Sequence, residues 1–196
     1  MADAQDHEHA HHEHQHQHQH IDYGEAIQAF RLDKDEFFQT SARSPLPETE
    51  REAFTGLPYF PVDEALRFEA LTLGSYTGGE PTSFQIPTSD GKLREAQRAG
   101  VLRFEFAGVR HGLTAYTFEG GHSESLFVPF LDGTSGKESY GAGRYLDLEP
   151  EDDGTYILDF NLAYHPSCVY DVKFSCPLTP AENRMPVRIE AGERLA

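Results

Sequence analysis

The spacing of apolar residues changes near residue 66, and the type of element that the chain predicts changes with it. Before that point the apolar positions at helical spacing are Tyr23, Ile27, Phe30, Phe37 and Phe38. Asp22 and Glu25 have the spacing of a capping box, which marks a helix start. The pattern predicts one helix from there to about Thr40, a break at residues 44–47 and a short second helix over roughly 48–54.

Beyond residue 66 the apolar period becomes two, which is typical of strands with one buried face. The alternating apolar positions are Leu102, Phe104 and Phe106, then Thr114, Tyr116 and Phe118, then Tyr156, Leu158, Phe160, Leu162 and Tyr164, and finally Val187, Ile189 and Ala191. Residues 126–131 are apolar on both faces and predict a central strand.

Tight-turn residues separate these strands, at 89–91, 119–121, 132–133 and 152–154. Short strands joined by tight turns predict a mainly β fold: an antiparallel β barrel or sandwich, preceded by an N-terminal helical segment. We expect residues 21–196 to form a single β-rich domain.

Charge excludes several classes of function. Among 196 residues, 33 are Asp or Glu and 16 are Lys or Arg, a net charge of −17 with His neutral. Such a surface argues against a nucleic-acid partner held by phosphate contacts and against an anionic membrane. The chain start lacks the basic and apolar stretches of a secretory signal, so we expect a soluble, cytoplasmic protein. The acids are spread along the chain, which favours adaptation to a salt-rich cytoplasm over avoidance of acidic partners.

Residues 1–20 combine many histidines with no apolar residue larger than Ala after Met1, and we expect them to be disordered. The histidines are His7, His9, His11, His12, His14, His16, His18 and His20. Alternating imidazoles on a flexible chain can share one zinc, nickel or copper ion. We expect this metal binding to be dispensable; the alternative is a purification tag or low-complexity drift. No other cofactor is indicated.

The first of three polar stretches covers residues 132–145, a glycine-rich loop that leads into a strand. Glycines permit close backbone approach to a ligand, but the phosphate-binding Gly-x4-Gly-Lys pattern is absent. The alternative is a polar loop in which Asp132 and Thr134 cap their own backbone.

The second stretch contains Asp159 and Asn161, which alternation places opposite the apolar face of their strand. If that strand is central, the acid needs a partner, and Arg144 is the best candidate because its planar fork suits a carboxylate. We predict that Arg144 lies within the strand layer and pairs with Asp132 or Asp159. The alternative is that this face is simply exposed to solvent.

The third stretch, residues 164–184, contains Cys168 and Cys176. They could form a disulfide, bind a metal with His165 as a third ligand, or remain two buried thiols, which we expect. A nucleophilic pair of Cys168 and His165 is a further alternative. We expect His111 and His122 to be surface or loop residues.

These stretches carry a resemblance to a known family. The order of Phe127-Val128-Pro129-Phe130, Tyr140-Gly141-Ala142-Gly143-Arg144, Asp159-Phe160-Asn161 and Glu182-Asn183-Arg184 resembles the bacterial and archaeal family called domain of unknown function 1684. The resemblance covers about residues 25–194 and implies no established activity. His165 departs from it, since the family usually has Asn there.

The resemblance implies that a set of polar residues belongs to the family pattern. They are Asp132, Thr134, Tyr140, Arg144, Asp159, Asn161, Tyr164, Cys168, Cys176, Glu182 and Asn183. We expect this cluster to bind a small, anionic ligand, with Thr134, Tyr140, Arg144, Asn161, Tyr164, Glu182 and Asn183 as contacts.

Two alternatives to ligand binding remain. The first is a hydrolase-like enzyme that uses Asp132 or Asp159 as general base, Arg144 as electrostatic stabiliser and Cys168 as nucleophile. In the second, the cluster is a buried network that fixes strand register.

Overall fold

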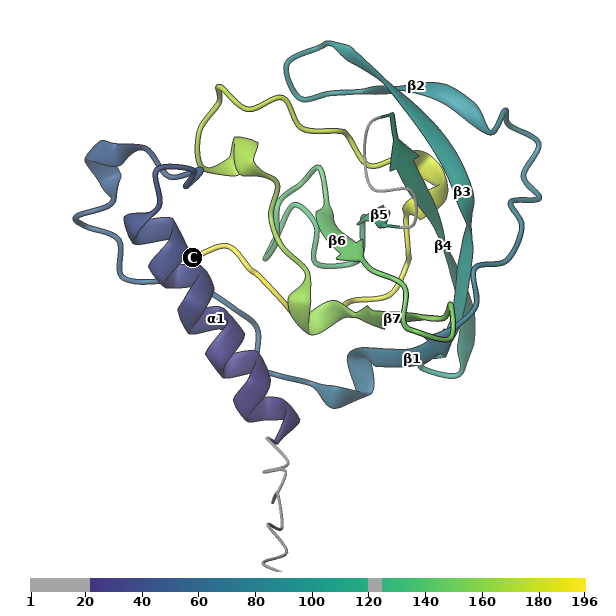
Figure 1. Ribbon diagram of the computed structural model, residues 1–196, viewed down its shortest axis with the longest axis horizontal. Helices are drawn as coiled ribbons and strands as arrows, with labels where there is room; N and C mark the ends of the chain where they lie inside the picture. The colour runs from purple at the N-terminus through teal and green to yellow at the C-terminus, as the bar shows by residue number, and fades with distance from the viewer. Residues whose placement is uncertain (1–21, 120–124) are drawn as a thin grey trace, which may run out of the picture.

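The computed structural model describes residues 22–119 and 125–196, which fold mainly into β structure behind one N-terminal helix (Figure 1). The helix is α1 (Tyr23–Thr40). The strands are β1 (Arg67–Leu71), β2 (Ser83–Pro87), β3 (Leu93–Phe106), β4 (Val109–Phe118), β5 (Leu126–Phe130), β6 (Arg144–Leu148) and β7 (Tyr156–Asp159).

The strands form two antiparallel sheets, and the expected mainly β class is confirmed. One sheet has the order β2-β3-β4-β5-β6 and the other pairs β1 with β7. The strands of the described residues do not close into a barrel, so the arrangement is sandwich-like. The core contains side chains of both sheets, among them Leu113, Val128 and Leu158.

The β3–β4 hairpin confirms the predicted alternation for β3 only. In β4 the residues that join the core are Leu113 and Ala115, so the predicted face of Thr114, Tyr116 and Phe118 is wrong by one position. The hairpin register pairs Leu102 with Leu113 and Phe104 with His111, and both leucines are fully buried. Ala107 and Gly108 form the turn with φ of 53° and 73°, the left-handed conformations that a two-residue hairpin turn requires.

Helix α1 begins and ends where the sequence predicts. The Asp22 carboxylate accepts hydrogen bonds from the amides of Gly24 and Glu25. The predicted buried face is partly wrong, because Phe30 and Phe37 are substantially exposed. Arg31 is buried instead, with its guanidinium 4.4 Å above the Tyr59 ring. Stacking on an aromatic ring lets an arginine occupy a position that the pattern gives to an apolar residue.

Three further predictions need correction. The second helix is only the 3₁₀ turn Glu48–Glu50. The strand expected to reach Tyr164 ends at Asp159, whose carboxylate caps a 3₁₀ turn, Phe160–Leu162, by accepting from the Asn161 amide. Residues 187–191 form no ladder with another strand, although Ile189 and Ala191 are completely buried.

The C-terminal segment runs between α1 and the strands (Figure 1). It is joined to α1 by an ion pair of 2.6 Å between Lys34 Nζ and Glu193 Oε1. In the described ranges, no helix combines the length and the apolar character that crossing a bilayer demands.

Asn183 repairs an interruption between two central strands. Pro129 lies in β5 and has no N–H to offer to β4. The Asn183 side chain lies in this gap: its amide nitrogen donates to the carbonyls of Thr114 and Pro129, each at 2.7 Å, and its oxygen accepts from Thr114 N at 2.8 Å. Asn183 itself is fully buried. One side chain therefore satisfies three backbone groups of the sheet.

We expect Asn183→Ala to lower the free energy of unfolding by about 3 kcal/mol or more, because each buried backbone group left without a partner costs about 1–3 kcal/mol. Asn183→Asp keeps the shape but loses both donors and should be no more stable than the alanine variant at neutral pH. Urea denaturation measures both. A loss below about 1 kcal/mol for the two variants would show that the amide is dispensable.

Candidate functional site

Arg144, the first residue of β6, lies fully buried in the strand layer. Its guanidinium donates to three backbone carbonyls of the C-terminal segment, those of Ile189, Ala191 and Glu193. It also lies 3.4 Å from Asp132 Oδ1, so the predicted pairing is confirmed with Asp132. Burial lowers the pKa of Arg144, which the Asp132 charge opposes. The side chain acts as the bonding partner that a neighbouring strand would give this segment.

Asp132 has its carboxylate oxygens occupied by protein donors. Oδ2 accepts from the amides of Thr134 at 3.1 Å and Ile189 at 2.8 Å. Oδ1 accepts from the hydroxyls of Thr134 at 2.9 Å and Ser135 at 3.1 Å. The glycine-rich loop therefore caps its own backbone, as the alternative interpretation of this stretch holds. The carboxylate and Thr134 are closed to solvent.

Asp159 and Asn161 form a second, separate cluster. Asp159 accepts from the Tyr23 hydroxyl at 2.8 Å and lies 3.7 Å from Arg67 Nε, so its cationic partner is Arg67. The Asn161 side chain accepts a hydrogen bond from Asp63 N at 2.9 Å and donates one to Asp63 O at 2.8 Å. Both Asp159 and Asn161 are buried, so the solvent-facing alternative is wrong for them. They attach α1 and the chain before β1 to the end of β7.

Glu182 belongs to a third group at the other end of the large sheet. Its Oε1 accepts from Arg98 Nε at 2.8 Å and from the Tyr116 hydroxyl at 2.9 Å. The neighbouring Asn183 bonds the backbone of β4 and β5, as described above. The charged residues of the predicted polar cluster thus lie in three separate groups, around Arg144, Asp159 and Glu182.

The Cys168–His165 nucleophile pair lacks a base. His165 Nε2 accepts a hydrogen bond from the Tyr140 amide at 3.2 Å, which occupies the ring's acceptor nitrogen. Burial lowers the His165 pKa to about 4. Both Cys168 and Cys176 are free thiols. Within the two described ranges, no three His, Cys, Asp or Glu side chains gather as metal ligands, which the zinc alternative requires.

The remaining histidines have different outcomes. The prediction for His111 is wrong, because it is buried in β4 against Phe104, with 5.6 Å between the ring centroids. His111 is buried because it lies opposite Phe104 in the β3–β4 register. His122 and the eight histidines of residues 1–20 lie outside the described residues.

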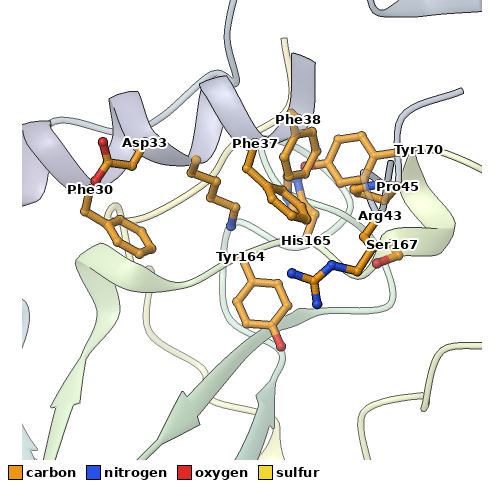
Figure 2. Close-up of a pocket in the computed structure, with 11 residues that line it drawn as sticks. Phe30, Asp33, Phe37, Phe38, Arg43, Pro45, Tyr164, His165, Ser167 and Tyr170 are labelled. Carbon is orange, nitrogen blue, oxygen red and sulfur yellow. The ribbon is translucent and has the colours of Figure 1, made fainter. Parts of the chain in front are cut away.

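A groove runs between α1 and the segment 164–170, and only Tyr164 of the predicted contacts lines it. Its cavity measures about 570 Å³. The lining residues are Phe30, Asp33, Lys34, Phe37, Phe38, Arg43, Pro45, Tyr164, His165, Ser167 and Tyr170. Figure 2 shows aromatic rings along both walls, with the Arg43 guanidinium between Tyr164 and Ser167.

The two cations of the groove differ in their partners. Lys34 is committed to Glu193, and its Nζ lies 4.9 Å from the centre of the Tyr164 ring. Arg43 is exposed, and none of the described carboxylates lies within ion-pair distance of it. Glu193 also accepts from the Tyr170 hydroxyl at 2.9 Å and from the His165 amide at 2.6 Å. This buried acid thus bonds three residues that line the groove, whereas Arg43 has no ion-pair partner among the described residues.

Tyr164 separates this groove from a neighbouring, acidic cavity of about 460 Å³, since it lines both together with Phe30. The second cavity contains Asp147, to which the Tyr164 hydroxyl donates at 2.5 Å. The hydrogen bond holds the Tyr164 ring as a wall of the groove.

Comparison with known proteins gives a family and a solved relative. The model of the family described as "Protein of unknown function (DUF1684)" matches residues 52–194. This chain belongs to the DUF1684 family. The solution NMR structure of an uncharacterised protein of Haloarcula marismortui is similar, with 41% identity, a TM-score of 0.65, and coverage of 87% of this chain and 92% of the other. No protein of curated function matches.

In this DUF1684 protein, Arg43 and α1 precede the residues that the family model matches, whereas Tyr164, Ser167 and Tyr170 lie within them. The sequence alone gave no indication of the groove's cation. Arg43 follows the helix in a stretch of small residues and proline, where no periodicity assigns it a face.

We expect Arg144→Ala to lower the free energy of unfolding by about 3–5 kcal/mol, because it leaves Asp132 buried without its cation. Arg188→Ala is the matched control, since Arg188 is exposed and its ion pairs with Glu138 and Glu190 are worth about 0–1 kcal/mol. Urea denaturation of both variants measures the difference. If Arg144→Ala and Arg188→Ala have equal free energies of unfolding, Arg144 does not stabilise the fold as expected.

Proposed function

We propose that the protein binds a small organic anion with an apolar body in the groove between α1 and residues 164–170. The observation that carries the proposal is Arg43, a cation with no ion-pair partner among the described residues, at an aromatic-lined cavity of about 570 Å³. Ligand cavities of about 300–1,000 Å³ with apolar walls and few polar groups are typical of small-molecule sites. A carboxylate or sulfonate on an aromatic or aliphatic body matches this chemistry.

The groove supplies each part of such a ligand with a partner. Arg43 offers a planar set of donors that suits a carboxylate, and the Ser167 hydroxyl lines the same cavity. Phe37 and Tyr164 offer ring faces to the apolar body (Figure 2). Aromatic pairs contribute about 0.5–1.5 kcal/mol beyond the area they bury.

Binding is better supported than catalysis. The carboxylates that the enzyme hypothesis needs, Asp132 and Asp159, are occupied by donors in the buried groups described above. The thiol hypothesis needs a base, and the acceptor nitrogen of His165 is used by Tyr140. The Arg144 network is better explained as support for the fold.

We expect Arg43→Ala to weaken binding of 1-anilinonaphthalene-8-sulfonate, an aromatic anion, about tenfold or more. A hydrogen bond to a charged group contributes about 1.5–3 kcal/mol. The uncharged analogue N-phenyl-1-naphthylamine should bind both proteins within about twofold, because it makes no use of the guanidinium. Fluorescence titration measures the four affinities.

Two control variants define the outcome. Arg110→Ala removes an equal charge from an exposed position in β4, away from the groove, and should leave both affinities unchanged. Phe37→Ala should weaken both probes, because it removes part of the apolar wall. Failure of the sulfonate to bind, or equal affinity for wild type and Arg43→Ala, would contradict the proposal.

A cytoplasmic, salt-rich setting is part of this proposal, and the net charge of −17 supports its salt-rich part. Repulsion among exposed carboxylates is screened when the Debye length falls from ~10 Å at 0.1 M salt to ~3 Å at 1 M. We therefore expect the thermal midpoint to rise between 0.1 M and 1 M KCl. An unchanged midpoint in calorimetry would leave the acid excess without this explanation.

A further inference from the structure

The two cysteines of the chain meet beside the groove. Cys168 lies in the 3₁₀ turn Ser167–Val169, and its backbone N–H points at the Cys176 sulfur, with 3.3 Å between N and Sγ. Because N–Cα is about 1.46 Å, this contact places the Cys168 Cα within about 4.8 Å of that sulfur. Disulfides join Cα atoms about 4.4–6.8 Å apart, a range with which this approach is compatible.

The two thiols differ in mobility and access. Cys176 is buried and anchored on both sides of its peptide: its amide donates to Ser89 Oγ at 3.1 Å, and its carbonyl accepts from Ser89 N at 2.8 Å. Cys168 is partly exposed, on a turn whose backbone-to-backbone hydrogen bonds are local. A reagent from solution therefore reaches Cys168 first, while Cys176 stays fixed behind it.

We propose that Cys168 and Cys176 are an oxidation site that closes to an intramolecular disulfide by exchange with a low-molecular-weight disulfide such as oxidised glutathione. The Cys168 thiolate attacks one glutathione sulfur, forms a mixed disulfide and releases the first glutathione thiolate. The Cys176 thiolate then attacks Cys168 Sγ and releases the second. The two cysteine thiol protons end on two glutathione thiols, so the protein loses two electrons and the oxidant gains them.

The surroundings of Cys176 keep its thiol unreactive until Cys168 has formed the mixed disulfide. Burial raises the Cys176 pKa to about 11, so this thiol stays protonated and unreactive toward solvent at neutral pH. The amide of Cys168 aims its hydrogen at the same sulfur and stabilises the thiolate when it forms. The pair is therefore a dithiol in reducing conditions and closes only after Cys168 has been captured.

Closure would act on the groove, a consequence that rests on the proposed function. Ser167 and Tyr170 line the cavity on the same turn as Cys168. Tyr170 also donates to Glu193, which pairs with Lys34 on the opposite side of the groove. A bond from Cys168 to the anchored Cys176 restrains this wall.

The test uses the full chain, in which these are the only two cysteines. Native protein is incubated with a series of reduced-to-oxidised glutathione ratios, free thiols are alkylated in acid-quenched samples, and intact mass is measured. The wild type should pass to a monomer that carries no alkyl group and no glutathione. Cys176→Ala should instead accumulate one glutathione on Cys168, and Cys168→Ser should keep its thiol free in the folded state, which circular dichroism checks.

Three outcomes would overturn the oxidation site: two free thiols at excess oxidised glutathione, a wild type that stops at the mixed disulfide as Cys176→Ala does, or covalent dimers. These readouts contain no groove ligand, so they are independent of the proposed function. The effect on the groove is measured separately, by an expected change of at least about twofold in affinity for 1-anilinonaphthalene-8-sulfonate between the dithiol and disulfide forms. Equal affinities would overturn that effect alone.

Discussion

The buried guanidinium of Arg144 fixes residues 189–193, through which the C-terminal segment contacts α1 and the strands. It replaces a strand partner for Ile189, Ala191 and Glu193, whose carbonyls it binds, while Asp132 balances its charge and binds the Ile189 amide. The segment is thereby held inside the molecule without a ladder of its own.

The contacts of the Glu193 side chain follow from this placement. Once its backbone is fixed by Arg144, its carboxylate meets Lys34 of α1, the His165 amide and the Tyr170 hydroxyl. The ion pair of Arg144 and Asp132 therefore helps to position α1 and the groove residues that Glu193 contacts.

Such an arrangement specifies a fold more than it strengthens one. Burying an ion pair costs desolvation that its attraction only partly offsets, whereas removing one member leaves a buried charge. Here the guanidinium recovers part of that cost from backbone carbonyls and from the rings of Phe60 and Phe130, 5.5 and 5.2 Å from Cζ. An apolar side chain at position 144 could fill the same space, but it would leave the carbonyls of the C-terminal segment without donors. The polar network is therefore best understood as the device that selects one path for the last residues of the chain.

The elements that sequence predicts well are those whose burial is decided locally. The helix cap at Asp22 and the alternation of β3 follow from residues a few positions apart, and both are found as expected. The C-terminal segment defeats prediction because its alternation is that of a strand, while its hydrogen-bond partner is a side chain 45 residues away from Ile189. The pairing of Arg144 with Asp132 could be predicted as one of two alternatives, but the bonds of Arg144 to the carbonyls of the C-terminal segment could not. Arg43 and Phe37 could not be singled out, since the groove exists only where α1 meets residues 164–170.

If the groove binds an anion as proposed, the net charge of the protein affects the affinity in a salt-dependent way. A protein with a net charge of −17 repels anions at long range when salt is dilute. Salt removes this repulsion, because at 1 M the Debye length is only ~3 Å. A direct contact between Arg43 and a carboxylate acts within that distance and is helped by the partly apolar groove, where screening is weaker than on the open surface. Lys34 contributes little to this attraction, since Glu193 already neutralises it at 2.6 Å. The same acidic surface that opposes anion binding in dilute buffer therefore leaves it intact in concentrated salt, where affinity for the ligand is decided inside the groove.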